Sequence, residues 1–369
     1  MSSGTELGPA TRIVASFDIP FTRYIDAAGT SLATLPAFAN DADELIRLYR
    51  AMMLTRIFDE KAIALQRTGR MGTYASSLGQ EAVGVGTASA MQADDVLLPS
   101  FREQSAMLWR GVTMAELLTY WGGNERGSDF KGPREDFPIC IPVGTQFPHA
   151  SGVALAMQIR RQPRCAVAMG GDGATSKGDF YEALNMAGVW KLPLLVVIND
   201  NQWAISVPRK AQSATQTLAQ KAVAVGIACE QVDGCDVVAV RDAAARALAR
   251  ARAGEGATLI EAVTYRLSDH TTADDAKRYR PDAEVSAHWK GEPVARLRAH
   301  LVARGAWTKE QELALIADLR REVEAAAAAY LASPPPPATD MFDYLFEELP
   351  TALEPQRARL VGQTGGDHG

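Results

Sequence analysis

The spacing of hydrophobic residues predicts an α/β protein. From Cys165 onward, three short apolar runs, CAVAMG, PLLVVIN and TLIEAVTYRL, are separated by segments of helical character, near Gly178 to Lys191 and near Asp236 to Ala253. Continuous apolar runs are typical of strands that are buried on both faces, and helices between such strands connect parallel neighbours. The pattern therefore predicts a parallel sheet with helices on both faces.

The N-terminal region has a different pattern. Residues 1–40 are rich in Gly, Ser, Thr, Pro and Ala without sustained periodicity, which predicts an arm lying over the surface or over a partner subunit. Asp41 and Glu44 have the spacing of a capping box, and the apolar residues that follow recur on one helical face until Arg67. A long helix is therefore expected after the arm.

The C-terminal region is expected to lie outside the main domain, which we assign to residues 41–333. Within that domain, residues 268–280 are too polar for a helix or strand and predict a long functional loop, and residues 310–332 predict a late helix. Residues 334–369 form a Pro-rich spacer and a tail, which includes the short amphipathic piece MFDYLFEELP.

Composition excludes several classes of protein. The 369 residues carry 38 Lys+Arg and 44 Asp+Glu, a net charge of −6, without the basic block that a nucleic-acid-binding surface needs. No apolar stretch approaches the roughly 18 residues of a membrane span, and no secretory signal is visible. The four cysteines have no CxxC pair, which predicts neither a zinc site nor a disulfide framework and favours a cytoplasmic protein (Cys140, Cys165, Cys229 and Cys235).

A glycine-rich turn follows the first apolar run, in the segment GGDGATSKG. Such a turn between a strand and a helix can bind phosphate through backbone N–H groups, although a plain turn without ligand has the same appearance. Asp172, between two glycines, would repel a bare diphosphate, so a divalent cation between them is expected. A nicotinamide-binding turn is disfavoured because Ser176 stands where GxGxxG requires its third glycine or alanine.

The second apolar run ends in Asn199-Asp200-Asn201, and Asn201 follows Asp172 by 29 residues. That length is about one helix and one strand, so the chain returns to the same edge of the sheet. Side-chain oxygens of Asp172 and Asn201, the carbonyl of Trp203, two diphosphate oxygens and a water would complete an octahedral Mg²⁺ site.

These residues resemble the cofactor motif of the thiamin-diphosphate fold, and the surrounding sequence, from about Glu44 to Leu349, resembles the alpha subunits of thiamin-dependent 2-oxo acid dehydrogenases. The resemblance implies that thiamin diphosphate and Mg²⁺ bind, with the metal held by Asp172, Asn201 and the Trp203 carbonyl, and the diphosphate by the backbone of Gly173 and Ala174. Within this motif one position departs from the family, which usually has asparagine where this chain has Asp200.

Two further stretches carry the same resemblance. In SFREQ, Phe101 and Arg102 stand where the family has Tyr-Arg, and the arginine is expected to reach the diphosphate. In IPVGTQFPHASG, the backbone around Val143 is expected to meet the aminopyrimidine. Relatives also bind a potassium ion near this segment, and a buried loop without an ion is an equally good interpretation (Pro142, Thr145 and Gln146).

His270 is the candidate catalytic histidine because it lies in the polar loop at the end of a strand. The loop resembles the family's mobile loop, whose histidine assists transfer to the lipoyl group. His149 is expected in a buried loop, and His288 and His300 on solvated helix surfaces. Relatives also have acids on the helix after the motif that line a proton tunnel between two cofactors, which here correspond to Asp179 and Glu182.

The resemblance also implies partners. The glutamate that activates the aminopyrimidine belongs to a second domain in this superfamily, so a beta subunit, an α2β2 assembly and a lipoyl acyltransferase component are expected. Pyruvate is the favoured 2-oxo acid, because the FEELP ending resembles bacterial pyruvate dehydrogenase alpha subunits, and a branched-chain 2-oxo acid is the alternative. A non-catalytic scaffold for a beta-like chain and a nicotinamide oxidoreductase are the alternatives from other classes.

Overall fold

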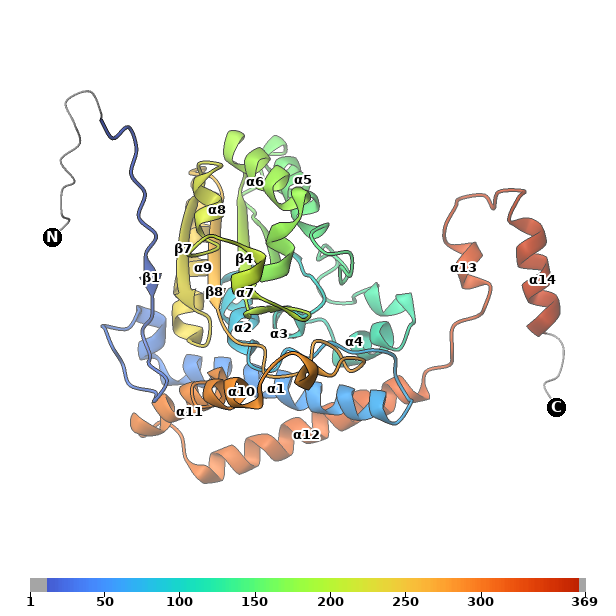
Figure 1. Cartoon of the computed structure of the whole chain (residues 1–369). Coiled ribbons are helices and arrows are strands. Elements are labelled where there is room, and N and C mark those ends of the chain that lie inside the picture. The colour runs from blue at the N-terminus through green and yellow to red at the C-terminus, as the bar shows by residue number, and fades with distance from the viewer. Residues whose placement is uncertain (1–11, 365–369) are drawn as a thin grey trace.

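A six-stranded parallel sheet organises the chain in the computed structural model, which describes residues 12–364 (Figure 1). Its strand order is β1-β7-β8-β4-β3-β2, and every neighbouring pair is parallel. The strands are β1 (Phe21–Thr22), β2 (Val96–Leu98), β3 (Ala166–Gly171), β4 (Leu194–Asp200), β7 (Ala228–Asp233) and β8 (Thr258–Val263). The predicted parallel sheet is confirmed.

Helices cover both faces of the sheet, because successive residues of a strand point to opposite sides. In β3, Val167 and Met169 belong to a core with α1 (Ala42–Arg67), α2 (Glu81–Ala90) and α9 (Val237–Arg252). Ala166 and Ala168 belong to a second core with α5 (Gln146–Ile159) and α6 (Gly178–Val189), which lie side by side in Figure 1. The shorter helices are α3 (Gln104–Arg110), α4 (Met114–Trp121), α7 (Arg209–Gln212) and α8 (Gln220–Val223).

The long helix α1 is confirmed, with two differences from the expectation. Asp41 is its N-cap and accepts a hydrogen bond from the Asp43 N–H at 2.9 Å, but no capping box forms, since Glu44 pairs with Arg47 and Arg241 instead. Its buried side chains also extend beyond one face, because α2, α3, α11 (Pro293–Ala303) and α12 (Lys309–Ala332) pack around it.

The N-terminal arm contributes the edge strand of the sheet. Thr22 of β1 aligns with Val232 of β7, and the Asp236 carboxylate accepts the backbone N–H groups of Tyr24 and Ile25, each at 2.7 Å. A single carboxylate therefore both caps α9 and anchors the arm to the sheet.

The C-terminal residues extend away from the main body in Figure 1. The chain continues through α10 (Asp282–Trp289), α11 and the long α12, and up to residue 364 it then forms two further helices, α13 (Asp340–Asp343) and α14 (Glu354–Thr364). The expected amphipathic piece thus forms a single helical turn, and Tyr344, Leu345 and Phe346 are exposed. No helix between residues 12 and 364 is long and apolar enough to cross a membrane.

Two histidine expectations were wrong. His300 is buried on α11, where its Nδ1 lies 3.0 Å from the Gly29 carbonyl, because the N-terminal arm packs over that helix. His149 is exposed on α5 rather than buried in a loop.

The strand predicted as TLIEAVTYRL ends at Val263, and the polar segment 268–280 is a loop with one 3₁₀ turn (Ala276–Arg278).

Candidate active site

A cavity of about 550 Å³ opens where four neighbouring strands end. The strands β2, β3, β4 and β8 are parallel, so the loops that follow them converge on one edge of the sheet, as in other open α/β sheets. Every residue expected to contact the cofactor or the metal lines this cavity (Phe101, Arg102, Val143, Asp172, Gly173, Ala174, Asn201, Trp203 and His270).

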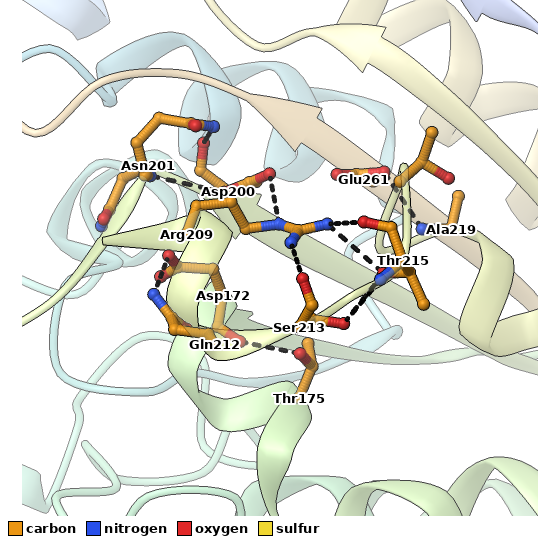
Figure 2. A network of polar contacts seen from close by, with 12 residues as sticks. Asp172, Thr175, Asp200, Asn201, Arg209, Gln212, Ser213, Thr215, Ala219 and Glu261 are labelled. Atoms are coloured by element: carbon orange, nitrogen blue, oxygen red, sulfur yellow. Dashed lines mark hydrogen bonds and ion pairs between the residues drawn. The ribbon is translucent and has the colours of Figure 1, made fainter. Parts of the chain in front are cut away.

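Asp172 begins the tight turn after β3. The turn is a 3₁₀ helix (Asp172–Ser176), and the Gln212 amide donates to Asp172 Oδ2 at 2.9 Å (Figure 2). Burial raises the pKa of Asp172, although the Gln212 hydrogen bond counteracts the shift. At Gly173 an added Cβ would lie 2.7 Å from the Ala204 Cβ, so the turn and the next loop approach as closely as glycine allows.

Asn201 lies just beyond the end of β4, next to the turn. Its Oδ1 accepts the Trp203 N–H at 3.2 Å, and its Nδ2 donates to Gln80 Oε1 at 3.0 Å. The Trp203 carbonyl accepts a hydrogen bond from Arg266 at 3.1 Å. The carboxylate of Asp172, the amide of Asn201 and the carbonyl of Trp203 thus border one cavity.

Asp200, the departure from the family pattern, does not line the cavity. It is the last residue of β4, so its side chain points to the opposite face from Asn201, toward Arg209 and Glu261 (Figure 2). Arg209 pairs with it at 3.4 Å, and burial, the Asp172 charge and a hydrogen bond with Glu261 raise its pKa well above the usual range. Because the raised pKa favours the protonated carboxyl, Asp200 resembles the neutral asparagine of the family.

Two buried arginines lie at the cavity: Arg102 is part of its wall, and Arg266 lies beside it, against His270. Arg102 donates to the Ser76 carbonyl at 2.6 Å and to the His270 carbonyl at 2.9 Å, and Arg266 donates to the Trp203 and Ile205 carbonyls. Neither guanidinium forms an ion pair in the described part of the chain, residues 12–364. Burial and the charge of Arg266 lower the pKa of Arg102 to about 10. The site therefore carries positive charge that an anion would neutralise.

His270 lies between these two arginines. Its Nδ1 is 3.2 Å from Arg102 Nη2 and 3.4 Å from Arg266 Nη1, and its backbone N–H donates to Asp274. The Phe101 ring packs against the imidazole edge to face, with centroids 5.9 Å apart. Burial and the two guanidinium charges lower its pKa to about 4, so the imidazole is neutral at neutral pH.

Other candidate residues lie at the margin of the cavity or outside it. Gln146 lines it and donates to the Met169 carbonyl at 2.9 Å, while its Oε1 has no partner among the described residues. Pro142 is exposed and Thr145 is half-buried beside it. Asp179 and Glu182 lie on α6 and do not contribute to the cavity wall within this chain.

The structure adds residues that sequence reasoning missed. Gln80, Asn199 and Glu103 line the cavity, and Arg266 contacts both His270 and the Trp203 carbonyl. Asn199 could have been found from the strand period of two, because it shares a face with Asn201. Glu103 directly follows Arg102 in the segment SFREQ, whereas Gln80 and Arg266 come from segments distant in sequence and no local pattern marks them.

The donor set fits the groups that the resemblance implies. One carboxylate, one amide oxygen and one backbone carbonyl are the oxygen ligands that Mg²⁺ prefers. No cluster of three His, Cys, Asp or Glu side chains suited to a metal occurs in residues 12–364. The close approach at Gly173 and the unpaired arginines match the backbone and charge that a diphosphate requires.

Comparison with known proteins identifies the family. The dehydrogenase E1 component family matches residues 49–339. The chain is 40% identical to the pyruvate dehydrogenase E1 component subunit alpha of Mycoplasma pneumoniae, over 86% of this chain and 88% of that protein. It is 39% identical to the subunit of the same name from Bacillus subtilis, over 85% of each, and 38% identical to that of Staphylococcus aureus, also over 85% of each. The chain therefore belongs to the dehydrogenase E1 component family, the thiamin-diphosphate-dependent 2-oxo acid dehydrogenases that its sequence resembles.

Proposed function

We propose that this chain is the alpha subunit of a pyruvate dehydrogenase E1 component and that it binds thiamin diphosphate through Mg²⁺. The observation that carries the proposal is the charge pattern of the cavity. Arg102 lines the cavity together with the buried carboxylate of Asp172 and the amide of Asn201, and Arg266 lies beside it against His270 and the Trp203 carbonyl; neither guanidinium forms an ion pair within residues 12–364. A diphosphate would neutralise the guanidinium groups, and its divalent cation would neutralise the carboxylate.

The metal would be held by Asp172, Asn201 and the Trp203 carbonyl. The raised pKa of Asp172 reflects the cost of burying its charge, and a divalent cation removes that cost. Gln212 holds the second carboxylate oxygen at 2.9 Å and so limits rotation of the side chain.

The diphosphate would be bound by Arg102 and by backbone N–H groups of Gly173 and Ala174. A guanidinium and a 3₁₀ turn at the end of a parallel strand are both typical anion-binding groups. Phe101 supplies a ring against His270 in place of the family's tyrosine hydroxyl, and the backbone around Val143, an exposed residue that lines the cavity, would meet the aminopyrimidine.

His270 would act close to the reacting atoms. When bound, thiamin diphosphate supplies the nucleophilic carbon that attacks the 2-oxo group and the electron-accepting ring that allows CO₂ to leave. The neutral imidazole can accept or donate a proton there, and its low pKa keeps it uncharged beside two cations. The Asp274 carboxylate, which accepts the His270 N–H at 2.9 Å, holds the loop in place.

Catalysis would require a beta subunit that supplies the activating glutamate, in an α2β2 heterotetramer, and a lipoyl acyltransferase that accepts the acyl group. The partly exposed Val143 and the cavity opening support a site that is completed by another chain. A proton path through Asp179 and Glu182, a potassium ion at Pro142, Thr145 and Gln146, and a cytoplasmic location remain parts of the proposal. The unpartnered Gln146 Oε1 supports the ion.

The test is CO₂ release with an artificial electron acceptor, measured on this chain co-expressed with its beta subunit. Pyruvate and 3-methyl-2-oxobutanoate are compared, each with and without thiamin diphosphate and Mg²⁺. Cofactor-dependent turnover that favours pyruvate is the expected result. Preference for the branched acid would assign the alternative substrate, and no turnover by an assembled complex would refute the enzyme proposal.

A further inference from the structure

Gln80 forms a junction of amide groups in the cavity wall. It lies at the N-terminus of α2, yet its side chain makes no cap hydrogen bond. Instead, Gln80 Oε1 accepts two hydrogen bonds, from Asn199 Nδ2 at 2.9 Å and from Asn201 Nδ2 at 3.0 Å. Its Nε2 has no partner among residues 12–364. The side chain is 2% exposed, so these contacts are buried.

The hydrogen bonds continue beyond Gln80. The Thr264 hydroxyl donates to Asn199 Oδ1 at 2.6 Å, which directs Asn199 Nδ2 toward Gln80. At the other end, Asn201 Oδ1 accepts the Trp203 N–H at 3.2 Å and keeps a second lone pair free. We call Thr264, Asn199, Gln80 and Asn201 the amide relay.

The amide relay admits one arrangement of its groups. If the Asn201 amide rotated by half a turn, its Nδ2 would face the Trp203 N–H and its Oδ1 would face Gln80 Oε1, so a donor would meet a donor and an acceptor an acceptor. Rotation of the Gln80 amide would bring an NH₂ group against the NH₂ groups of both asparagines. Buried groups left in that state cost about 1–3 kcal/mol each.

We propose that Gln80 is a positioning residue for the metal site and that the amide relay holds Asn201 with Oδ1, rather than Nδ2, toward the cation. The inference rests on the proposed function, because it assumes that Asn201 is a metal ligand. Only an oxygen can bind Mg²⁺ at this position, so the orientation of the amide decides whether the ligand is available. Groups that orient a metal ligand typically change metal affinity about 10- to 100-fold when they are removed.

The placement of Gln80 follows from the backbone before it. Gly79 has φ = +88°, and a Cβ there would lie 2.6 Å from the Tyr265 carbonyl. This close approach brings the start of α2 against the segment after β8 that carries Thr264. The relay therefore joins three elements that are far apart in sequence.

The test uses the assembled complex with the beta subunit, and Mn²⁺ as a probe for the metal. Mn²⁺ binding in the presence of thiamin diphosphate is followed by the loss of the free-ion signal in electron paramagnetic resonance, and thermal stability is measured in parallel. Gln80→Met should weaken Mn²⁺ binding about 10- to 100-fold. Gln80→Glu keeps an acceptor for both asparagines and should bind Mn²⁺ more tightly than Gln80→Met does.

Thr264→Val tests the far end of the relay without changing the cavity wall, because Thr264 is not part of that wall. It should weaken Mn²⁺ binding at least threefold when it is the only substitution. Combined with Gln80→Met, it should cause no further loss of Mn²⁺ affinity. Thr258→Val, in the same region of the chain, is the matched control, because its buried hydroxyl has no partner among the described residues and its Mn²⁺ affinity should be unchanged.

Wild-type affinity in both Gln80→Met and Thr264→Val would overturn the inference, as would fully additive losses in the double variant. If Gln80→Met fails to assemble, Thr264→Val alone decides the matter. If the wild-type complex itself binds neither Mn²⁺ nor thiamin diphosphate, the proposed function fails and the relay has no metal ligand to orient.

Discussion

Replacing Arg102 with methionine should separate stability from cofactor binding. The guanidinium is buried, donates to the Ser76 and His270 carbonyls at 2.6 and 2.9 Å, and lies 5.4 Å from the centre of the Phe101 ring. It forms no ion pair within residues 12–364. Methionine has a similar length and keeps the apolar stem without the charge.

The expected magnitudes follow from these contacts. Burial and the Arg266 charge lower the pKa of Arg102 from its ordinary value to about 10, and at about 1.4 kcal/mol per tenfold change the charge costs on the order of 3 kcal/mol in the cofactor-free protein. The two hydrogen bonds lost with the guanidinium contribute about 1 kcal/mol each. The variant should therefore be as stable as the wild type to within about 2 kcal/mol, or more stable.

The cofactor should respond in the opposite direction. A hydrogen bond between charged groups is worth about 1.5–3 kcal/mol, so loss of Arg102 should weaken thiamin diphosphate binding about 10- to 150-fold. Calorimetric titration with Mg²⁺ present measures the affinity, and urea unfolding of the cofactor-free complex measures the stability. Arg126→Met is the control, because that exposed arginine pairs only at the surface with Asp340. Unchanged affinity together with a large loss of stability would refute the reasoning and make Arg102 a structural residue.

Three further predictions concern the same cavity. Burial and two neighbouring guanidinium groups lower the pKa of His270 to about 4. Its imidazole in the cofactor-free complex should therefore stay neutral down to about pH 5. The contribution of the neutral imidazole to stability should be lost as the pH falls from about 6.5 through 4. A nuclear magnetic resonance titration with a midpoint near 6.5 would contradict this. Gly173→Ala should weaken thiamin diphosphate binding and cost about 1–3 kcal/mol of stability, because its Cβ would meet the Ala204 Cβ at 2.7 Å. Gly178→Ala, whose Cβ meets nothing within 4 Å and lies outside the cavity wall, should be nearly neutral in calorimetric and unfolding assays. Asp200→Asn restores the family's usual residue. It should leave thiamin diphosphate affinity within about threefold of wild type, because the side chain lies outside the cavity wall. A tenfold change in affinity, measured by titration, would show that the charge of Asp200 reaches the cofactor.

Local pattern predicted the secondary structure of the central sheet well, because its signal is carried by contiguous residues. The apolar runs at β3 and β4 and the N-cap Asp41 were all found where the structure has them. The pattern failed where a distant segment covers a residue. His300 is on a helix, as expected, but the N-terminal arm buries it, and no local periodicity reports that contact.

The amino-acid sequence by itself determined the strand ends that carry Asp172 and Asn201, and the motif at those positions was enough to indicate the cofactor class. Two adjacent parallel strands bring such residues to one edge whatever the rest of the chain does. Only the tertiary structure decided which groups surround them. Gln80 and Arg266 act through hydrogen bonds between segments far apart in the chain, whereas the period of two along β4 already places Asp200 on the face opposite to Asn199 and Asn201. The geometry of hydrogen bonds between distant segments is set by tertiary packing, and the order of neighbouring residues in the sequence does not specify that packing.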